Sequence, residues 1–142
     1  MSVETDWSTR MRGQELHHRR LLTPSLTPAV VTTRGRRETN QDRVCALRTL
    51  VGGEPAVLLA VADGIGGLPA GEQAADLALQ VVSHYAHYVI PDLGADPEAL
   101  RAGLSELVRA ASRRIWLWAR DHGLGGTAGS TLVCALVWGR RY

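Results

Sequence analysis

Residues 60–72, with the sequence AVADGIGGLPAGE, decide how the rest of the chain is interpreted. The apolar run 56–62 ends in a single carboxylate, Asp63, and several glycines follow before a helical pattern begins. A buried strand that ends in an acid and a glycine-rich turn brings backbone close to a bound metal or phosphate, and carboxylate oxygens suit hard cations such as Mg²⁺ and Mn²⁺. The dipeptide Asp63-Gly64 is equally typical of a tight hairpin turn, so the neighbouring sequence has to decide.

The composition is typical of a globular domain, but the set of basic residues is unusual. The chain has 142 residues, is 45% hydrophobic and carries a formal net charge of +2, which favours one folded domain and gives no argument for nucleic acid. All 16 basic residues are arginine, so mechanisms that need a P-loop or Schiff-base lysine are excluded. Residues 1–12 lack the apolar core of a signal peptide, and no apolar run approaches the roughly 20 residues that span a bilayer. We therefore expect a cytoplasmic protein with neither a nucleic-acid nor a membrane partner.

The cysteines and the histidines offer weak alternatives for a metal site. Cys45 and Cys134 match no metal-ligand or redox spacing, and we predict that they are small buried hydrophobes in a reducing compartment. His84 and His87 lie three residues apart on a predicted helix, but no third ligand accompanies them, which favours a surface or packing role.

Residues 1–28 are predicted to be a flexible extension, because their charges are mixed and prolines interrupt residues 23–28. A basic cluster at 17–20 offers a surface to an acidic partner, although a solvated tail is the simpler interpretation. Residues 29–142 are predicted to form the folded domain.

Hydrophobic periodicity predicts the elements of this domain. Strands are expected at 29–33, 43–51, 56–62 and 130–138, and helices at 71–89 and 97–120. The turn 52–55 is short, so the strands on either side of it should pair antiparallel, and the near-continuous apolar run 56–62 should be buried on both faces. Asp96 followed by Pro97 is typical of a helix N-terminus. Consecutive strands followed by helices that cover one face predict an α+β fold.

Two acids and one arginine are the candidate functional residues. Asp42 and Asp63 lie at predicted strand ends, so pairing of those strands brings both carboxylates to one edge of the sheet as part of a Mg²⁺ or Mn²⁺ site. Arg37 precedes Asp42 on the same loop, and a guanidinium is a natural bidentate partner for phosphate. The alternative for Arg37 and Asp42 is a surface ion pair of little energetic consequence.

Three segments in this order resemble a known family. They are Arg37-x-x-Asn40-Gln41-Asp42, then Val61-Ala62-Asp63-Gly64-Ile65-Gly66-Gly67-x-x-x-Gly71-Glu72, and then Gly129-Ser130-Thr131-Leu132. They are similar to motifs of the metal-dependent (PPM, type 2C) serine/threonine protein phosphatases. The second segment is the most specific of the three.

The resemblance implies an antiparallel β-sandwich flanked by helices (α-β-β-α) and hydrolysis of phosphoserine and phosphothreonine in proteins by a water that bridges two Mn²⁺ or Mg²⁺ ions. In it, Asp63 would bridge the ions, the Gly64 carbonyl would ligate one of them, and Asp42 would contribute directly or through a water. Arg37 would hold the substrate phosphate. The implied partners are phosphoproteins, such as substrates of a bacterial serine/threonine kinase.

The resemblance covers only part of a family domain. Family members are longer, with a second half that completes the sandwich and adds further aspartates, so we expect residues 29–142 to correspond to the N-terminal half with an incomplete metal centre and an unpaired sheet edge. Gln41 stands where many members have glutamate, which weakens a ligand role there. The alternative function is that of a truncated, inactive relative that acts as a binding or regulatory module, or a fragment.

Overall fold

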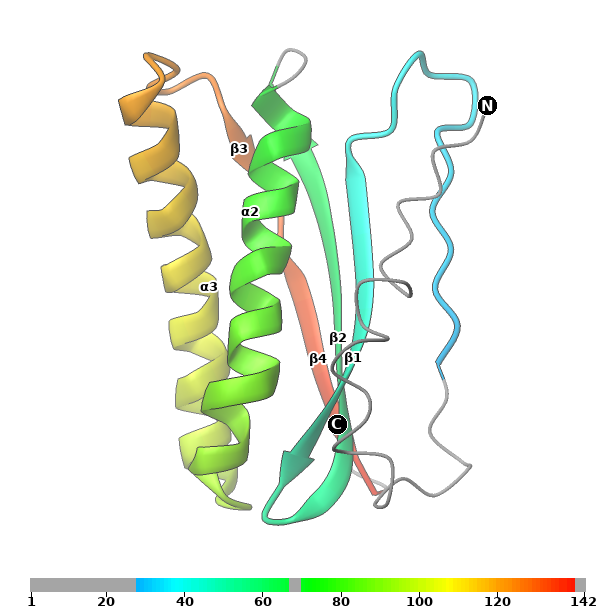
Figure 1. Ribbon diagram of the computed structural model, residues 1–142, viewed down its shortest axis with the longest axis vertical. Helices are drawn as coiled ribbons and strands as arrows, with labels where there is room; N and C mark the ends of the chain where they lie inside the picture. The colour runs from blue at the N-terminus through cyan, green and yellow to red at the C-terminus, as the bar shows by residue number, and fades with distance from the viewer. Residues whose placement is uncertain (1–27, 67–69, 140–142) are drawn as a thin grey trace.

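The computed structural model describes residues 28–66 and 70–139, which form a four-stranded antiparallel sheet and two long helices (Figure 1). The strands are β1 (Asp42–Val51), β2 (Glu54–Ile65), β3 (Gly129–Ser130) and β4 (Val133–Trp138). The helices are α2 (Ala70–His84) and α3 (Pro97–Asp121), which are connected through a π-helical turn η1 (Tyr85–Val89) and a 3-10 turn η2 (Ile90–Leu93). The predicted α+β class with an antiparallel sheet is confirmed.

β2 is the central strand of the sheet. It pairs antiparallel with β1 on one side, as predicted, and with β4 and the short β3 on the other, so that Ala60 lies opposite both Cys45 and Cys134. The strand continues beyond residue 62 because Gly64 and Ile65 pair with β3. Asp63 and Gly64 therefore lie within a strand, and the hairpin interpretation is wrong.

The predicted strand at 29–33 is also wrong. Residues 28–34 have no regular secondary structure, and the Val31 side chain is 88% exposed. β-branched residues favour extended backbone, but a strand also needs a neighbouring strand with which to pair. Within the described ranges this segment has none. The extension predicted for 1–28, with its basic cluster at 17–20, lies outside the described residues apart from its last one.

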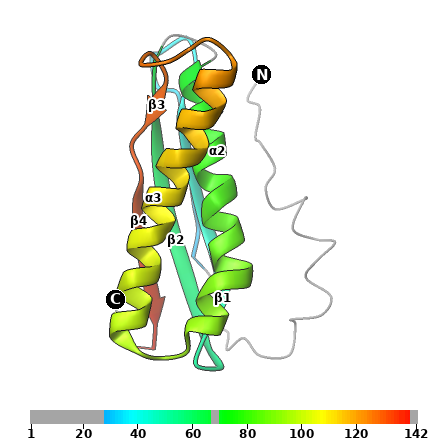
Figure 2. The same ribbon diagram turned by 90° about the vertical axis from the view of Figure 1, so that its left-hand side faces the viewer.

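The hydrophobic core lies between the sheet and the helices. α2 contributes three alanines with no exposed surface, Ala74, Ala75 and Ala78, and α3 contributes a stripe that includes Leu107 and Ala111. Small side chains allow α2 to pack closely on the sheet. Figure 2 shows the two helices side by side, with the strands running along them.

The opposite face of the sheet is partly open to solvent. Val61 is 50% exposed and its cross-strand partner Val133 is 69% exposed. The prediction that 56–62 is buried on both faces holds for Ala56, Val57 and Leu58 and is wrong for Val61. The reason is that both described helices pack on the same side of the sheet, so the other side lacks a covering layer in the described part of the chain.

The helices begin and end close to their predicted positions. Asp96 is the N-cap of α3, and its carboxylate accepts hydrogen bonds from the backbone N–H groups of Glu98 and Ala99, both at 3.3 Å. The single helix predicted at 71–89 changes to π-helical geometry at Tyr85, where the buried Thr49 hydroxyl donates to the Ala86 carbonyl at 2.5 Å. None of the described helices is both long and apolar enough to cross a bilayer.

The two cysteines flank Ala60 on the helix-facing side of the sheet, and both thiols are free. Two strand spacings separate their backbones by about 9–10 Å, beyond the roughly 7 Å that a disulfide allows. Burial, together with the neighbouring Cys134 thiol, raises the pKa of Cys45 to about 12, and burial raises the pKa of Cys134 to about 11.

We expect both thiols to resist modification in the folded protein. At pH 8 the raised pKa values leave very little thiolate, so the reaction with Ellman's reagent should be about a hundredfold slower than in the unfolded chain. The measurement compares rates in buffer and in guanidinium chloride. Equal rates in the two solvents would contradict the buried position of these side chains.

Candidate metal and phosphate site

The register of β1 and β2 places Asp42 directly opposite Asp63. The Gly64 N–H donates to the Gln41 carbonyl at 3.2 Å, so the adjacent Asp42–Asp63 pair is of the non-hydrogen-bonded kind, in which the Cα atoms are only about 4.5 Å apart. Side chains of such a pair lie on the same face of the sheet. The two carboxylates therefore converge at one end of the sheet, on the face away from the helices.

Among the residues that the structure describes, neither carboxylate has a positively charged partner. Within the described ranges, neither the Asp42 nor the Asp63 side chain accepts a hydrogen bond or forms an ion pair. Two like charges directly opposite each other on a sheet repel and destabilise it. A divalent cation bound between them removes that repulsion, which is the physical reason to regard the pair as a metal site.

The pair forms one wall of a pocket of about 260 Å³. The pocket is lined by Thr33, Arg34, Arg37, Thr39, Asn40, Gln41, Asp42 and Asp63. The structure thus brings together three of the predicted site residues, Arg37, Asp42 and Asp63. Gly64 follows Asp63 in β2 but does not line the pocket. Arg37 and Asp42 form no ion pair in the described part of the chain, so the surface-pair alternative is not realised.

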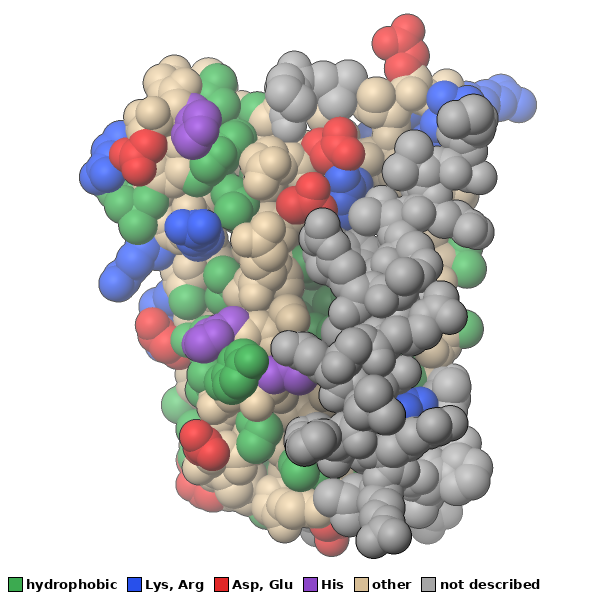
Figure 3. All heavy atoms as spheres, in the orientation of Figure 1, with side chains coloured by type: hydrophobic (Ala, Val, Ile, Leu, Met, Phe, Trp, Pro, Cys, Tyr) green, Lys and Arg blue, Asp and Glu red, His purple; other side chains and the backbone are tan. Residues whose placement is uncertain are grey.

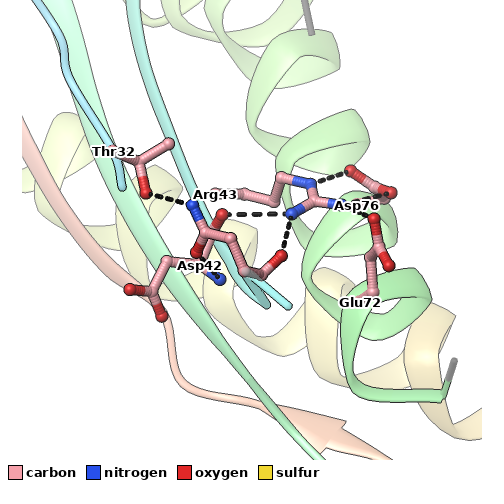
Figure 4. Close-up of polar contacts among 6 residues, drawn as sticks. Thr32, Asp42, Arg43, Glu72 and Asp76 are labelled. Atoms are coloured by element: carbon pink, nitrogen blue, oxygen red, sulfur yellow. Dashed lines mark hydrogen bonds and ion pairs between the residues drawn. The ribbon is translucent and has the colours of Figure 1, made fainter. Parts of the chain in front are cut away.

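The loop that carries Arg37 is fixed by Asn40. The Asn40 side chain accepts a hydrogen bond from the Asp42 N–H at 3.0 Å and donates to the Thr32 hydroxyl at 2.9 Å (Figure 4). A turn closes where the Arg37 N–H donates to the Arg34 carbonyl at 3.1 Å. Gln41 donates to the Gly66 carbonyl at 3.3 Å, so its amide joins the two loops, which agrees with the weak ligand role expected for it.

The third sequence segment holds the backbone of Asp63. The Thr131 hydroxyl accepts the Asp63 N–H at 3.0 Å, and the Asp63 carbonyl accepts the Thr131 N–H at 2.8 Å and the Ser130 hydroxyl at 3.1 Å. Three hydrogen bonds thus fix the residue whose carboxylate faces Asp42. This role could not be predicted from the sequence, because the contact between Thr131 and Asp63 joins residues 68 positions apart.

Gly64 and Gly71 bring the start of α2 against β2. A Cβ atom on Gly64 would lie 2.1 Å from the Gly71 carbonyl oxygen, which is an impossible contact. Gly64 therefore needs to be glycine for this close backbone approach, and a Cβ atom on Gly71 would lie only 3.1 Å from the Gly64 carbonyl oxygen, which is a tight contact. This contact sets the distance between α2 and the end of β2 that carries Asp63.

Arg43 connects β1 to α2 beside the site. Its guanidinium donates to Asp76 at 2.7 Å and to Glu72 at 2.5 Å, and also to the backbone carbonyls of Asn40 and Asp42. Burial by itself lowers the pKa of Arg43, but the hydrogen bonds to Asp76 and Glu72 outweigh it and raise the pKa above its ordinary value. Figure 4 shows Asp42 and Arg43 on opposite sides of the strand. The sequence did not predict this contact, because 33 and 29 positions separate Arg43 from Asp76 and Glu72.

The described donor set fits one side of a hard cation. Asp42 and Asp63 supply carboxylate oxygens, the donors that Mg²⁺ and Mn²⁺ prefer. The described residues contain no group of three or more histidine, cysteine or acidic side chains placed to hold a metal. His84 and His87 are engaged elsewhere: the ring of His84 lies 5.3 Å from that of Tyr88, and His87 Nδ1 lies 2.7 Å from the Ser83 carbonyl oxygen.

Comparison with known proteins identifies the fold. No protein-family model and no curated protein matches the sequence, but solved structures do. The serine/threonine phosphatase of S. agalactiae aligns with a TM-score of 0.61 at 21% identity, over 73% of this chain and 40% of its own. The chain has part of the bacterial serine/threonine phosphatase fold. A bacterial serine phosphatase crystallised as a point mutant gives a TM-score of 0.62 at 21% identity, over 74% of this chain and 45% of its own.

These alignments confirm the predicted resemblance at the level of the phosphatase fold. The chain spans less than half the length of either phosphatase it matches. At 21% identity the likeness establishes architecture, and the roles of Arg37, Asp42, Asp63 and Gly64 stay predictions.

We expect the Arg43 contacts to stabilise the folded state substantially. The side chain is only 11% exposed, so Arg43→Met leaves Glu72 and Asp76 without their partner and should lower the free energy of unfolding by about 2 kcal/mol. Urea unfolding followed by circular dichroism measures this.

The matched control is Arg101→Met, which removes an exposed ion pair with Glu98. Its effect should stay within about 0.5 kcal/mol. Equal destabilisation by the two substitutions would show that the Arg43 contacts contribute no more than a surface pair.

Proposed function

We propose that this pocket is the metal-binding and phosphate-binding part of a serine/threonine protein phosphatase that hydrolyses phosphoserine and phosphothreonine with Mn²⁺ or Mg²⁺. The observation that carries the proposal is the direct opposition of Asp42 and Asp63, two carboxylates with no cationic partner in the described part of the chain, in a pocket that Arg37 also lines. The fold shared with bacterial serine/threonine phosphatases supports the same reaction class.

Each residue has a role that follows from its position. Asp63 and Asp42 would hold the divalent cations through their carboxylates, and the Gly64 carbonyl would be the backbone ligand. Arg37 orients the substrate phosphate by bidentate hydrogen bonding, and Arg34, in the same pocket, adds positive charge. When bound, the divalent ions supply Lewis-acid chemistry that activates water and neutralises charge on the phosphoryl oxygens.

The backbone contacts of Asp63 are important for this function. A bridging carboxylate has to keep its position as substrate enters and product leaves, because positioning errors of about 1 Å are costly in catalysis. The hydrogen bonds from Ser130 and Thr131 and the contact between Gly64 and Gly71 provide that rigidity.

A second candidate is a non-catalytic module with the phosphatase fold. It is favoured by the number of acidic ligands, since the described residues place two carboxylates in the pocket and the proposed reaction uses two ions. Such a module would bind a phosphorylated partner through Arg37 without turnover. The two candidates differ in metal binding and in phosphate release, and both can be measured.

We expect the full chain to bind Mn²⁺ and to release phosphate from a phosphothreonine peptide only when Mn²⁺ is present. Asp63→Asn removes one of the two opposed charges and should weaken Mn²⁺ binding by about a hundredfold, because even outer-shell changes cost about ten- to a hundredfold. Titration calorimetry measures the binding, and a malachite-green assay measures the phosphate.

The control for charge is Asp92→Asn, which changes an exposed acid in η2, beyond the C-terminal end of α2. It should leave both readouts unchanged. Mn²⁺ binding that Asp63→Asn does not alter would refute the proposed site. Mn²⁺ binding that Asp63→Asn weakens, without any turnover by the unmodified chain, would support the non-catalytic module.

Substitution of Arg37 tests the proposed phosphate contact separately from metal binding. Arg37→Ala should raise KM, or the Kd for the phosphopeptide in the non-catalytic case, by about tenfold and leave Mn²⁺ affinity unchanged. Arg36→Ala is the matched control, because Arg36 is the adjacent, exposed arginine and does not line the pocket. Equal effects of the two substitutions would show that the loop contributes only general positive charge.

A further inference from the structure

The outer side of α3, which faces away from the sheet, carries an exposed tryptophan beside a shallow hollow. Trp116 is 60% exposed, and the hollow has a volume of about 570 Å³. It is lined by Arg109, Ser112, Arg113, Trp116 and Leu117, which we call the Trp116 surface. These residues recur at intervals of three and four, so they form one continuous stripe along the helix.

Some of the arginines on and beside this stripe are paired with acidic side chains, and one of them is not. Arg109 and Arg120 form ion pairs with Glu106 and Asp121, both at 2.8 Å. Arg113, by contrast, forms no ion pair within the described residues. Figure 3 shows basic side chains gathered beside hydrophobic ones along the edge that α3 forms. The Trp116 surface therefore combines apolar area with unneutralised positive charge.

Arg120 holds the tryptophan ring in place. Its guanidinium carbon lies 5.2 Å from the centroid of the Trp116 ring, which is within cation–π range. A ring that is already positioned loses little conformational freedom when a partner covers it. Tryptophan and arginine are also the residues most enriched among those that dominate binding energy at protein interfaces.

We propose that the Trp116 surface binds an acidic segment of a partner protein that carries one large apolar side chain. The apolar side chain enters the hollow against Trp116 and Leu117. Carboxylates on either side of that apolar side chain pair with Arg113 and compete with Glu106 for Arg109. Charge complementarity and the size of the hollow together select this class of partner.

A lipid surface fits these features less well. Interfacial helices insert a broad apolar face, whereas the large apolar residue exposed on this stripe is Trp116, and the apolar face of α3 is already buried against the sheet and α2. A hollow next to one aromatic ring suits a single side chain.

This surface is independent of the proposed active site. Asp42 and Asp63 lie on the sheet face away from the helices, and the Trp116 surface lies on the side of α3 away from the sheet. Failure of docking therefore leaves the proposed phosphatase function untouched, and the converse also holds.

The test uses the full chain and a fluorescein-labelled peptide of glutamates around a single central leucine, followed by fluorescence anisotropy. Trp116→Ala and Arg113→Glu should each weaken binding by about tenfold. Arg114→Glu is the matched control: it makes the same charge change at the next residue, which is exposed but outside the hollow, and should change binding less than twofold. Circular dichroism checks that each variant is folded.

Control ligands separate the two contributions. The peptide with glutamine in place of glutamate tests charge, and the peptide with serine in place of leucine tests the apolar anchor; both should bind about tenfold more weakly. Absence of peptide binding, or equal losses in Arg113→Glu and Arg114→Glu, would overturn the proposal. Binding to phosphatidylglycerol vesicles that is stronger than binding to the peptide would overturn it in favour of a membrane surface.

Discussion

The antiparallel register between β1 and β2 places Asp42 opposite Asp63, and the rest of the site is built around that pair. Side chains alternate between the faces of a strand, so a shift of one residue would move Asp42 to the helix-facing side and carry Arg43 to the open side. Such a shift would bury a carboxylate and remove the arginine from its acidic partners. The proposed metal site and the ion-pair network thus depend on the same register.

Two features hold this register. The hairpin between the strands turns at Gly52 and Gly53, both of which have positive φ angles that favour glycine. At the other end of the strands, Arg43 pairs with acids on α2. One feature is local and the other joins distant segments, so the pairing is constrained at both ends. Together, these two features keep the opposed carboxylates close to each other, against their mutual repulsion, when no cation is bound.

The local parts of the structure could be predicted from sequence, and the long-range parts could not. Periodicity predicted both long helices and the N-cap Asp96, and the short turn predicted the pairing of β1 with β2. The motifs predicted Arg37, Asp42 and Asp63 as neighbours, and the pocket contains all three. The extension of β2 through Asp63 could not be predicted, because it depends on pairing with β3 across more than 60 residues. The exposed Val31 shows the converse error, in which strand propensity was present without a partner strand.

At the contact between Gly64 and Gly71, backbone atoms alone set the distance between β2 and α2. Elsewhere in the core, a change in one side chain can be absorbed by its neighbours, so the distance between elements can drift as sequences diverge. Here no side chain intervenes, and no repacking can compensate for an added methyl group. We therefore expect the end of β2 that carries Asp63 to keep a nearly invariant geometry as the sequence of this protein varies elsewhere.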